Sequence, residues 1–188
     1  PTIPEEKGWI SLAHCPSIQG RQRKIQLELA RKYNLRYTPP AGGCLLTNVE
    51  YGRKVRDLLQ ADGALTVDSL RLLSTGRHFR LSPNYKGIIG RNRQENRELC
   101  RYFYQHRWDS NLYLLKGRGA PGPLTLGVGR PDSEAQKTLA HLTAHYGDHP
   151  KQVTVTVKVL SAGPDHRREE IAVFNDPTHL DLDKFRIT

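Results

Sequence analysis

Cysteine, methionine and long apolar runs are scarce or absent in this chain of 188 residues. Its three cysteines, Cys15, Cys44 and Cys100, lie far apart, which excludes a disulfide framework and a zinc knuckle and favours a reducing compartment. No apolar run reaches the roughly 18 residues of a membrane helix, and the N-terminus lacks an apolar signal core. We therefore expect a cytoplasmic protein with no membrane contact and no bound metal. We interpret the absence of methionine as the mark of a segment from a longer chain, in preference to a chain that has lost its initiator.

Negative charge is scarce in one part of the chain. The net charge is +10, and residues 1–118 contain 21 Lys and Arg against 10 Asp and Glu. Residues 119–188 contain 8 Lys and Arg against 9 Asp and Glu. A surplus this large on one segment indicates a polyanionic partner, and we prefer a nucleic acid to the alternative of a merely solvated surface.

The first 75 residues have helical patterns. Three helices are expected here, over residues 17–34, 47–63 and 66–76. In the first, Ile25 and Leu29 lie four residues apart on one face. The second begins with Thr47 and Glu50, which have the spacing of a capping box. We interpret residues 1–75 as a helical lead-in.

From residue 76 the pattern changes to short apolar segments with strand periodicity. Strands are expected over residues 77–82, 86–90, 111–115, 124–128, 152–160 and 169–174. Two helices are expected between them, with Asn92 and Asp132 as their N-caps. The sequence therefore predicts an α+β fold in which one antiparallel sheet is covered by helices.

Ordered sequence blocks after residue 76 carry a family resemblance. The segments GIIGRNRQEN, APGPLTLGV, VTVTVKVL and LDLDKFRI follow one another in this order. Together they resemble the RNA-binding domain of the NFACT proteins over residues 76–188, which implies an RNA-binding function for this part. The chain departs from that family at Tyr113 and Leu114, where an aromatic residue and a histidine are usual. We therefore assign to this chain no role that the histidine has in the family.

The first part resembles a different family. The segments GRQRKIQLELARKYNL and TPPAGGCLLT, followed by a basic helix, are similar to the tail of bacterial PP-loop ATPases related to tRNA thiouridylases. The resemblance implies a tRNA partner, a sulfur-donor protein, and ATP bound by a Ser-Gly-Gly-x-Asp-Ser loop. No such loop occurs in these 188 residues. We therefore expect ATP to be the cofactor of an upstream domain, and we expect no cofactor in this chain.

Cys44 is the candidate catalytic residue. It follows Gly42 and Gly43, which allow the backbone to approach a substrate closely, and nearby basic residues favour a reactive thiolate. These features suit a persulfide carrier, in line with the thiouridylase resemblance. Leu45 and Leu46 follow directly and favour a buried structural cysteine instead. The sequence leaves both interpretations open.

Basic residues on helices and turns are the candidate RNA contacts. In the lead-in they are Arg21, Arg23, Lys24, Arg53, Lys54 and Arg56. Near the predicted sheet the candidates are five basic residues and one asparagine: Arg77, His78, Arg80, Arg91, Asn92 and Arg93. Guanidinium groups and the free N–H groups of a helix start both bind phosphates, and His78 can stack on an unpaired base. We expect phosphate contacts to dominate.

These observations predict an RNA-binding module, with tRNA as its partner, that forms the C-terminal portion of a tRNA thiolation enzyme. On its own the chain would bind RNA without catalysing a reaction. Two alternatives stay open. One is an adaptor that holds ribosomal RNA, as in ribosome-associated NFACT proteins, and the other is an autonomous sulfur carrier built on Cys44.

Overall fold

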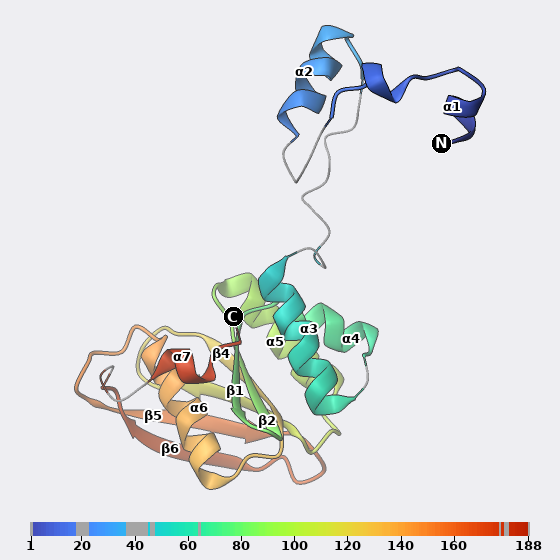
Figure 1. The fold of residues 1–188 in the computed structure, drawn as a ribbon. Coiled ribbons are helices and arrows are strands. Elements are labelled where there is room, and N and C mark those ends of the chain that lie inside the picture. Colours follow the sequence, from blue (N-terminus) through green and yellow to red (C-terminus); the bar gives the residue numbers. More distant parts are fainter. Residues whose placement is uncertain are drawn as a thin grey trace. The chain divides into compact units, whose positions relative to one another are not determined.

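The computed structural model describes residues 2–17, 23–36, 45, 48–63, 65–176, 178 and 181–187. The chain divides into two compact units, residues 1–42 and 43–188 (Figure 1). Residues 48–75, which the sequence pattern grouped with the lead-in, belong by their contacts to the unit that contains the sheet. No helix in these described ranges is long and apolar enough to cross a bilayer.

The first unit contains short helical elements with exposed side chains. Helix α1 (Ile3–Glu6) begins after Thr2, and a 3-10 turn spans Leu12–His14. Helix α2 spans Lys24–Lys32, within the predicted range 17–34. None of the residues in these three elements is buried. They therefore gain little stability from the removal of apolar surface from water.

Helices α3 (Val49–Asp62) and α4 (Val67–Leu73) open the second unit. The Asn48 side chain accepts a hydrogen bond from Tyr51 N, so α3 is capped one residue later than the sequence predicted. Thr66 caps α4 at the start of the predicted range. Both helix starts follow from local hydrogen bonds between side chain and backbone.

Six strands form one antiparallel sheet in the order β1-β2-β4-β3-β5-β6. Their bounds are Arg77–Ser82 (β1), Tyr85–Ile89 (β2), Leu112–Gly117 (β3), Leu124–Gly129 (β4), Thr154–Ser161 (β5) and Arg168–Phe174 (β6). Each predicted strand overlaps one of these strands, and the α+β fold class is confirmed. The pairing of β2 with β4 and of β3 with β5 makes neighbours of strands that are not consecutive in the chain.

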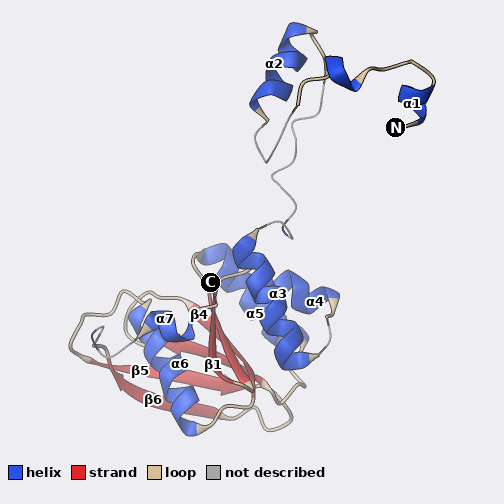
Figure 2. Ribbon diagram, viewed as in Figure 1, coloured by secondary structure: helices blue, strands red, loops and turns tan. Residues whose placement is uncertain are grey.

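Helices cover both faces of the sheet (Figure 2). Helix α6 (Ser133–His145) packs on one face, where Leu139 is fully buried. Helix α5 (Arg93–Gln105) packs on the other face through Leu99 and Phe103. The short helix α7 (Leu182–Phe185) contacts β1. The core therefore consists of two apolar layers separated by the sheet.

Two cross-strand glycines allow α6 to approach the sheet closely. Gly87 and Gly127 are register partners on β2 and β4. A Cβ atom on Gly87 would lie 2.2 Å from Leu139 Cδ1, and one on Gly127 would lie 2.2 Å from the Tyr85 hydroxyl. That hydroxyl donates a hydrogen bond of 2.5 Å to Gln136, although Tyr85 is fully buried. The two glycines therefore make room for α6 and for its buried polar contact.

Candidate nucleic-acid interface

A tight turn precedes helix α5 and leads into the helix N-terminus. The Asn92 side chain caps the helix by accepting a hydrogen bond from Glu95 N at 3.0 Å, as the sequence predicted. The Asn96 side chain accepts one from Leu124 N at 3.0 Å and so connects the first turn of α5 to β4. A Cβ atom on Gly90 would lie 2.1 Å from the Asn96 oxygen, so a larger residue there would displace the Asn96 side chain from its place. The turn and the helix start therefore form one fixed unit.

A hollow of about 340 Å³ lies at this helix start. We name it the GRNR pocket, and its lining residues are Arg77, Gly90, Arg91, Asn92, Arg93, Asn96, Gly122, Pro123, Tyr146 and Asp148. The lining contains three arginines and one carboxylate. The first N–H groups of a helix add a partial positive charge. The pocket therefore suits an anion such as a phosphate.

Arg77 is held against an aromatic ring at the wall of the GRNR pocket. Its guanidinium carbon lies 4.7 Å from the centroid of the Tyr146 ring, which is a cation–π contact. The Tyr146 ring in turn lies 6.0 Å from that of Phe79, which is fully buried. No carboxylate in the described part of the chain lies within ion-pair distance of Arg77. Its charge is therefore available to a ligand.

Arg91 makes hydrogen bonds within the protein. Its guanidinium donates to both carboxylate oxygens of Glu95, at 2.9 and 3.1 Å from Nε, and to Ser74 O at 3.4 Å. Burial opposes ionisation of Glu95, but the hydrogen bonds from Arg91 and its charge outweigh burial and lower the pKa of that carboxyl. The Arg91 side chain is still 48% exposed. It therefore positions the turn and adds less net charge to the pocket than Arg77 and Arg93 do.

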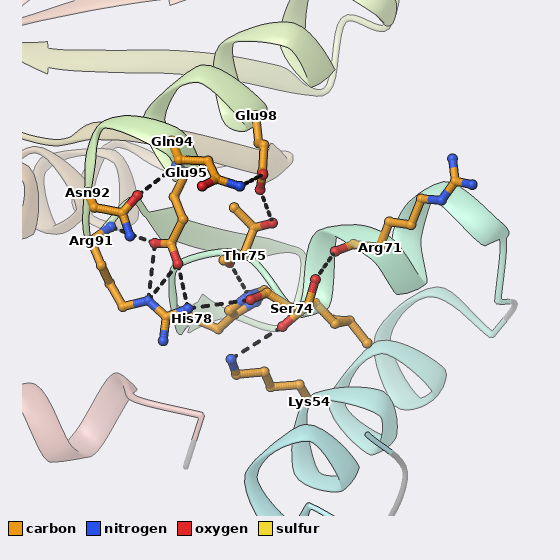
Figure 3. A network of polar contacts seen from close by, with 11 residues as sticks. Lys54, Arg71, Ser74, Thr75, His78, Arg91, Asn92, Gln94, Glu95 and Glu98 are labelled. Carbon is orange, nitrogen blue, oxygen red and sulfur yellow. Dashed lines mark hydrogen bonds and ion pairs between the residues drawn. The ribbon is translucent and has the colours of Figure 1, made fainter. Parts of the chain in front are cut away.

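A polar network secures the loop between α4 and β1 beside the pocket (Figure 3). The Thr75 hydroxyl donates to Glu98 at 3.0 Å, and the Lys54 ammonium group donates to Leu73 O at 3.3 Å. The His78 Nε2 atom lies 2.9 Å from Thr75 O, and because a carbonyl only accepts, Nε2 carries the proton. The network thus joins α3, this loop and α5.

Two of the predicted RNA contacts, His78 and Lys54, belong to this network and are wholly or partly shielded from solvent. His78 is 1% exposed, and burial, together with the charges of Lys86 and Lys54, lowers the pKa of its imidazole well below the ordinary value. Burial and the charge of Arg91 lower the pKa of Lys54. From inside the core the His78 ring cannot reach a base, because the sheet and the loop enclose it.

Arg80 is held by an acidic residue of helix α3. Asp57 accepts hydrogen bonds from Arg80 at 2.9 and 2.7 Å and from Lys86 at 3.1 Å. The Asp57 side chain is 16% exposed and that of Lys86 is 6% exposed. Burial opposes ionisation of Asp57, but the hydrogen bonds from Arg80 and the charge of Lys86 outweigh burial and lower the pKa of the carboxyl. Arg80, a predicted RNA contact, therefore attaches α3 to the sheet.

The other predicted residues are dispersed. Exposed side chains belong to Arg23 and Lys24 near the start of α2, to Arg53 and Arg56 on α3, and to Arg93 on α5. Arg21 and the candidate carrier Cys44 lie outside the described residues. At the GRNR pocket the structure brings together Arg77, Arg91, Asn92 and Arg93. The predicted contacts thus include one spatial cluster.

Sequence reasoning missed two residues that decide the geometry of this region. Tyr146 follows the last turn of α6, and nothing in its local pattern indicates that it lies against Arg77. Asp57 is the one acidic residue between Glu50 and Asp62 in an otherwise basic segment. A lone carboxylate in a basic helix is a signal that could have predicted an internal ion pair.

The second unit matches a known family. A family model for the NFACT protein RNA-binding domain matches residues 76–184. The C-terminal part of the fibronectin/fibrinogen-binding protein from Streptococcus suis is similar in structure, with 13% identity, a TM-score of 0.47, and coverage of 87% of this chain and 72% of that chain. No curated protein matches the sequence. Because the family model spans more than half of the residues and begins where the sheet begins, the chain belongs to the NFACT RNA-binding domain family.

Proposed function

We propose that residues 43–188 bind RNA by holding backbone phosphates at the GRNR pocket. The observation that carries this proposal is the convergence of Arg77, Arg91 and Arg93 on the N-terminus of helix α5. Guanidinium groups and helix N–H groups recognise the same ligand, so together they would bind a phosphate more tightly than either alone. Membership of the NFACT family supports RNA as the polyanion.

The RNA that we propose is tRNA, in the context of a cytoplasmic tRNA thiolation enzyme. The support is the segment PAGGCLLT with the basic helix after it, which resembles the tail of PP-loop thiouridylases. In such an enzyme this chain supplies RNA binding, an upstream domain supplies ATP chemistry, and a separate protein delivers sulfur. Cys44 remains the candidate carrier for that sulfur.

A titration with tRNA at several salt concentrations tests the proposal. Phosphate contacts release counterions, so log K should fall linearly with log salt concentration, by about 0.7 to 0.9 per contact. The double variant Arg77→Ala/Arg93→Ala should reduce this slope by about 1.5. Lys137→Ala/Arg167→Ala removes the same charge elsewhere and should leave the slope unchanged. An affinity that does not depend on salt, or an equal effect of both variants, would refute the proposal.

Ribosomal RNA is the second candidate ligand, because the family description names RNA without naming its kind. An adaptor of this type would use the same GRNR pocket. Competition between ribosomes and free tRNA for the labelled chain separates the two candidates. Retention on ribosomes in excess tRNA would favour the adaptor, and displacement by tRNA would favour the thiolation context.

A further inference from the structure

The sheet face that carries helix α5 is only partly covered. Helix α5 packs over Leu112, Leu126 and Ala162. Beside this contact, strands β3 to β6 line an open groove of about 540 Å³, which we name the sheet groove. Three leucines of its lining are half-buried, three further side chains are basic and two are acidic: Leu114, Leu124, Leu160, Lys116, Lys158, Arg168, Glu169 and Glu170.

Two lysines of the sheet groove face each other. Lys116 and Lys158 are register partners on β3 and β5, so their side chains leave the same face of the sheet. Like charges directly opposite in an antiparallel pair are destabilising. Within the described ranges neither ammonium group has an ion-pair partner, and Glu170, the register partner of Lys158, lies 3.9 Å from Arg118 instead. An anion placed between the two lysines would remove this repulsion.

The sheet groove and the GRNR pocket are lined by neighbouring residues. Pro123 lines the pocket and Leu124, the next residue, lines the groove and donates its N–H group to Asn96 of the pocket. Leu124 is also the register partner of Lys116. From the start of α5, the cationic side chains of this face therefore follow one another across the sheet, with Lys116 first and Lys158 next.

We infer that the sheet groove binds an unpaired RNA strand whose adjoining phosphate occupies the GRNR pocket, an inference that rests on the proposed function. Lys116 and Lys158 would hold successive phosphates, and the leucines would contact bases. Bases can reach the leucines only when they are free of a complementary strand. Leucine side chains cannot exchange hydrogen bonds with base edges, so the groove should accept a strand with little sequence preference.

The binding of a labelled single-stranded oligouridylate to the full chain tests this inference. Lys116→Glu/Lys158→Glu should weaken binding at least about tenfold and reduce the salt slope by about 1.4, which is the value for two phosphate contacts on a single strand. Lys116→Arg/Lys158→Arg keeps the charge and should keep the affinity. Lys137→Glu/Lys184→Glu makes the same change of charge on α6 and α7, and it should leave the affinity within about twofold. Thermal unfolding of each variant verifies that it is folded.

A blunt RNA hairpin with a minimal loop separates this inference from the proposed function. This hairpin can use the GRNR pocket but not the groove. The Arg77→Ala/Arg93→Ala variant should therefore bind it more weakly than the wild type does, and Lys116→Glu/Lys158→Glu should bind it as well as the wild type does.

Equal oligouridylate affinities of the groove variant and its charge control would overturn the inference and leave the pocket proposal intact. Tighter binding of an oligoglutamate peptide than of oligouridylate would also overturn it, in favour of an acidic protein partner. If neither RNA binds the wild-type chain, the proposed function itself fails.

Discussion

Two sets of basic residues in the second unit have different surroundings. The inner set is bound to the backbone or to Asp57 and consists of Lys54, His78, Arg80 and Lys86. The outer set lines the GRNR pocket and consists of Arg77 and Arg93, whereas Arg91 of the same pocket is held in part by Glu95 and is intermediate between the two sets. Both sets contribute to the same charge surplus in the sequence. The comparison shows that a count of basic residues includes those used in folding, and that neighbouring carboxylates and burial separate the two uses.

The largest expected effect comes from removal of the acid that holds the inner set. Asp57→Asn should lower the free energy of unfolding by about 3 kcal/mol, because the buried Lys86 and the half-buried Arg80 lose their counter-charge. Denaturant unfolding at pH 7 measures this loss. The RNA affinity of the folded variant should stay within about twofold. A stability equal to that of the wild type would show that the inner set does not hold α3 in place.

Asp57 also predicts an acid-dependent loss of stability. Its pKa is lowered in the folded state, so its stabilising effect is complete above the ordinary value of 3.8 and is lost as the pH falls through the folded-state pKa. Asp57→Asn should remove this part of the pH dependence.

The outer set should show the opposite behaviour. Arg77→Ala/Arg93→Ala should reduce RNA affinity by about 2 kcal/mol, or roughly 30-fold, because two charge-assisted contacts are lost. The free energy of unfolding should change by less than about 1 kcal/mol, since the cation–π contact with Tyr146 is the main internal interaction of Arg77. Fluorescence anisotropy and denaturant unfolding provide the two measurements. A stability loss as large as that of Asp57→Asn would make the two sets equivalent.

A buried histidine gives the inner set a pH signature. Because the pKa of His78 is lowered in the fold, the unfolded chain binds a proton below pH 6.5 and the folded chain does not. The contribution of the neutral His78 to stability is therefore fully present above pH 6.5. The free energy of unfolding should fall by about 1 kcal/mol between pH 7 and pH 5.5. His78→Gln keeps a donor for Thr75 O and should show a smaller loss over this interval. Equal pH dependences of the two proteins would contradict a neutral, buried His78.

The smallest effect separates capping from phosphate binding at a single residue. Asn92→Asp keeps an N-cap acceptor for α5, so the free energy of unfolding should stay within about 0.5 kcal/mol. The new negative charge repels a phosphate in the GRNR pocket and should weaken RNA binding about threefold. Asn92→Ser, which caps without the charge, is the control. Equal affinities of the Asp and Ser variants would place the phosphate elsewhere.

Local patterns predicted more of the fold than of the site. The caps Asn92 and Asp132 and the six strands follow from nearby residues, because hydrogen bonds at helix starts and strand periodicity are local. The contact between Tyr146 and Arg77 depends on how α6 crosses the sheet, which no local pattern encodes. In the same way, the neutralisation of Arg80 depends on the position of α3 against β1. The sequence therefore predicted where the charge lies along the chain but not which charges are free.

Side-chain NMR of the arginines tests the distinction between the two sets most directly. The Nε–Hε signals would be followed while a short RNA strand is added to the isotopically labelled chain at low salt. The signals of Arg77 and Arg93 should shift in a saturable manner, and that of Arg80 should stay in place because Asp57 holds its guanidinium. A saturable shift of Arg80 with constant signals for Arg77 and Arg93 would contradict the assignment of the GRNR pocket as the phosphate site.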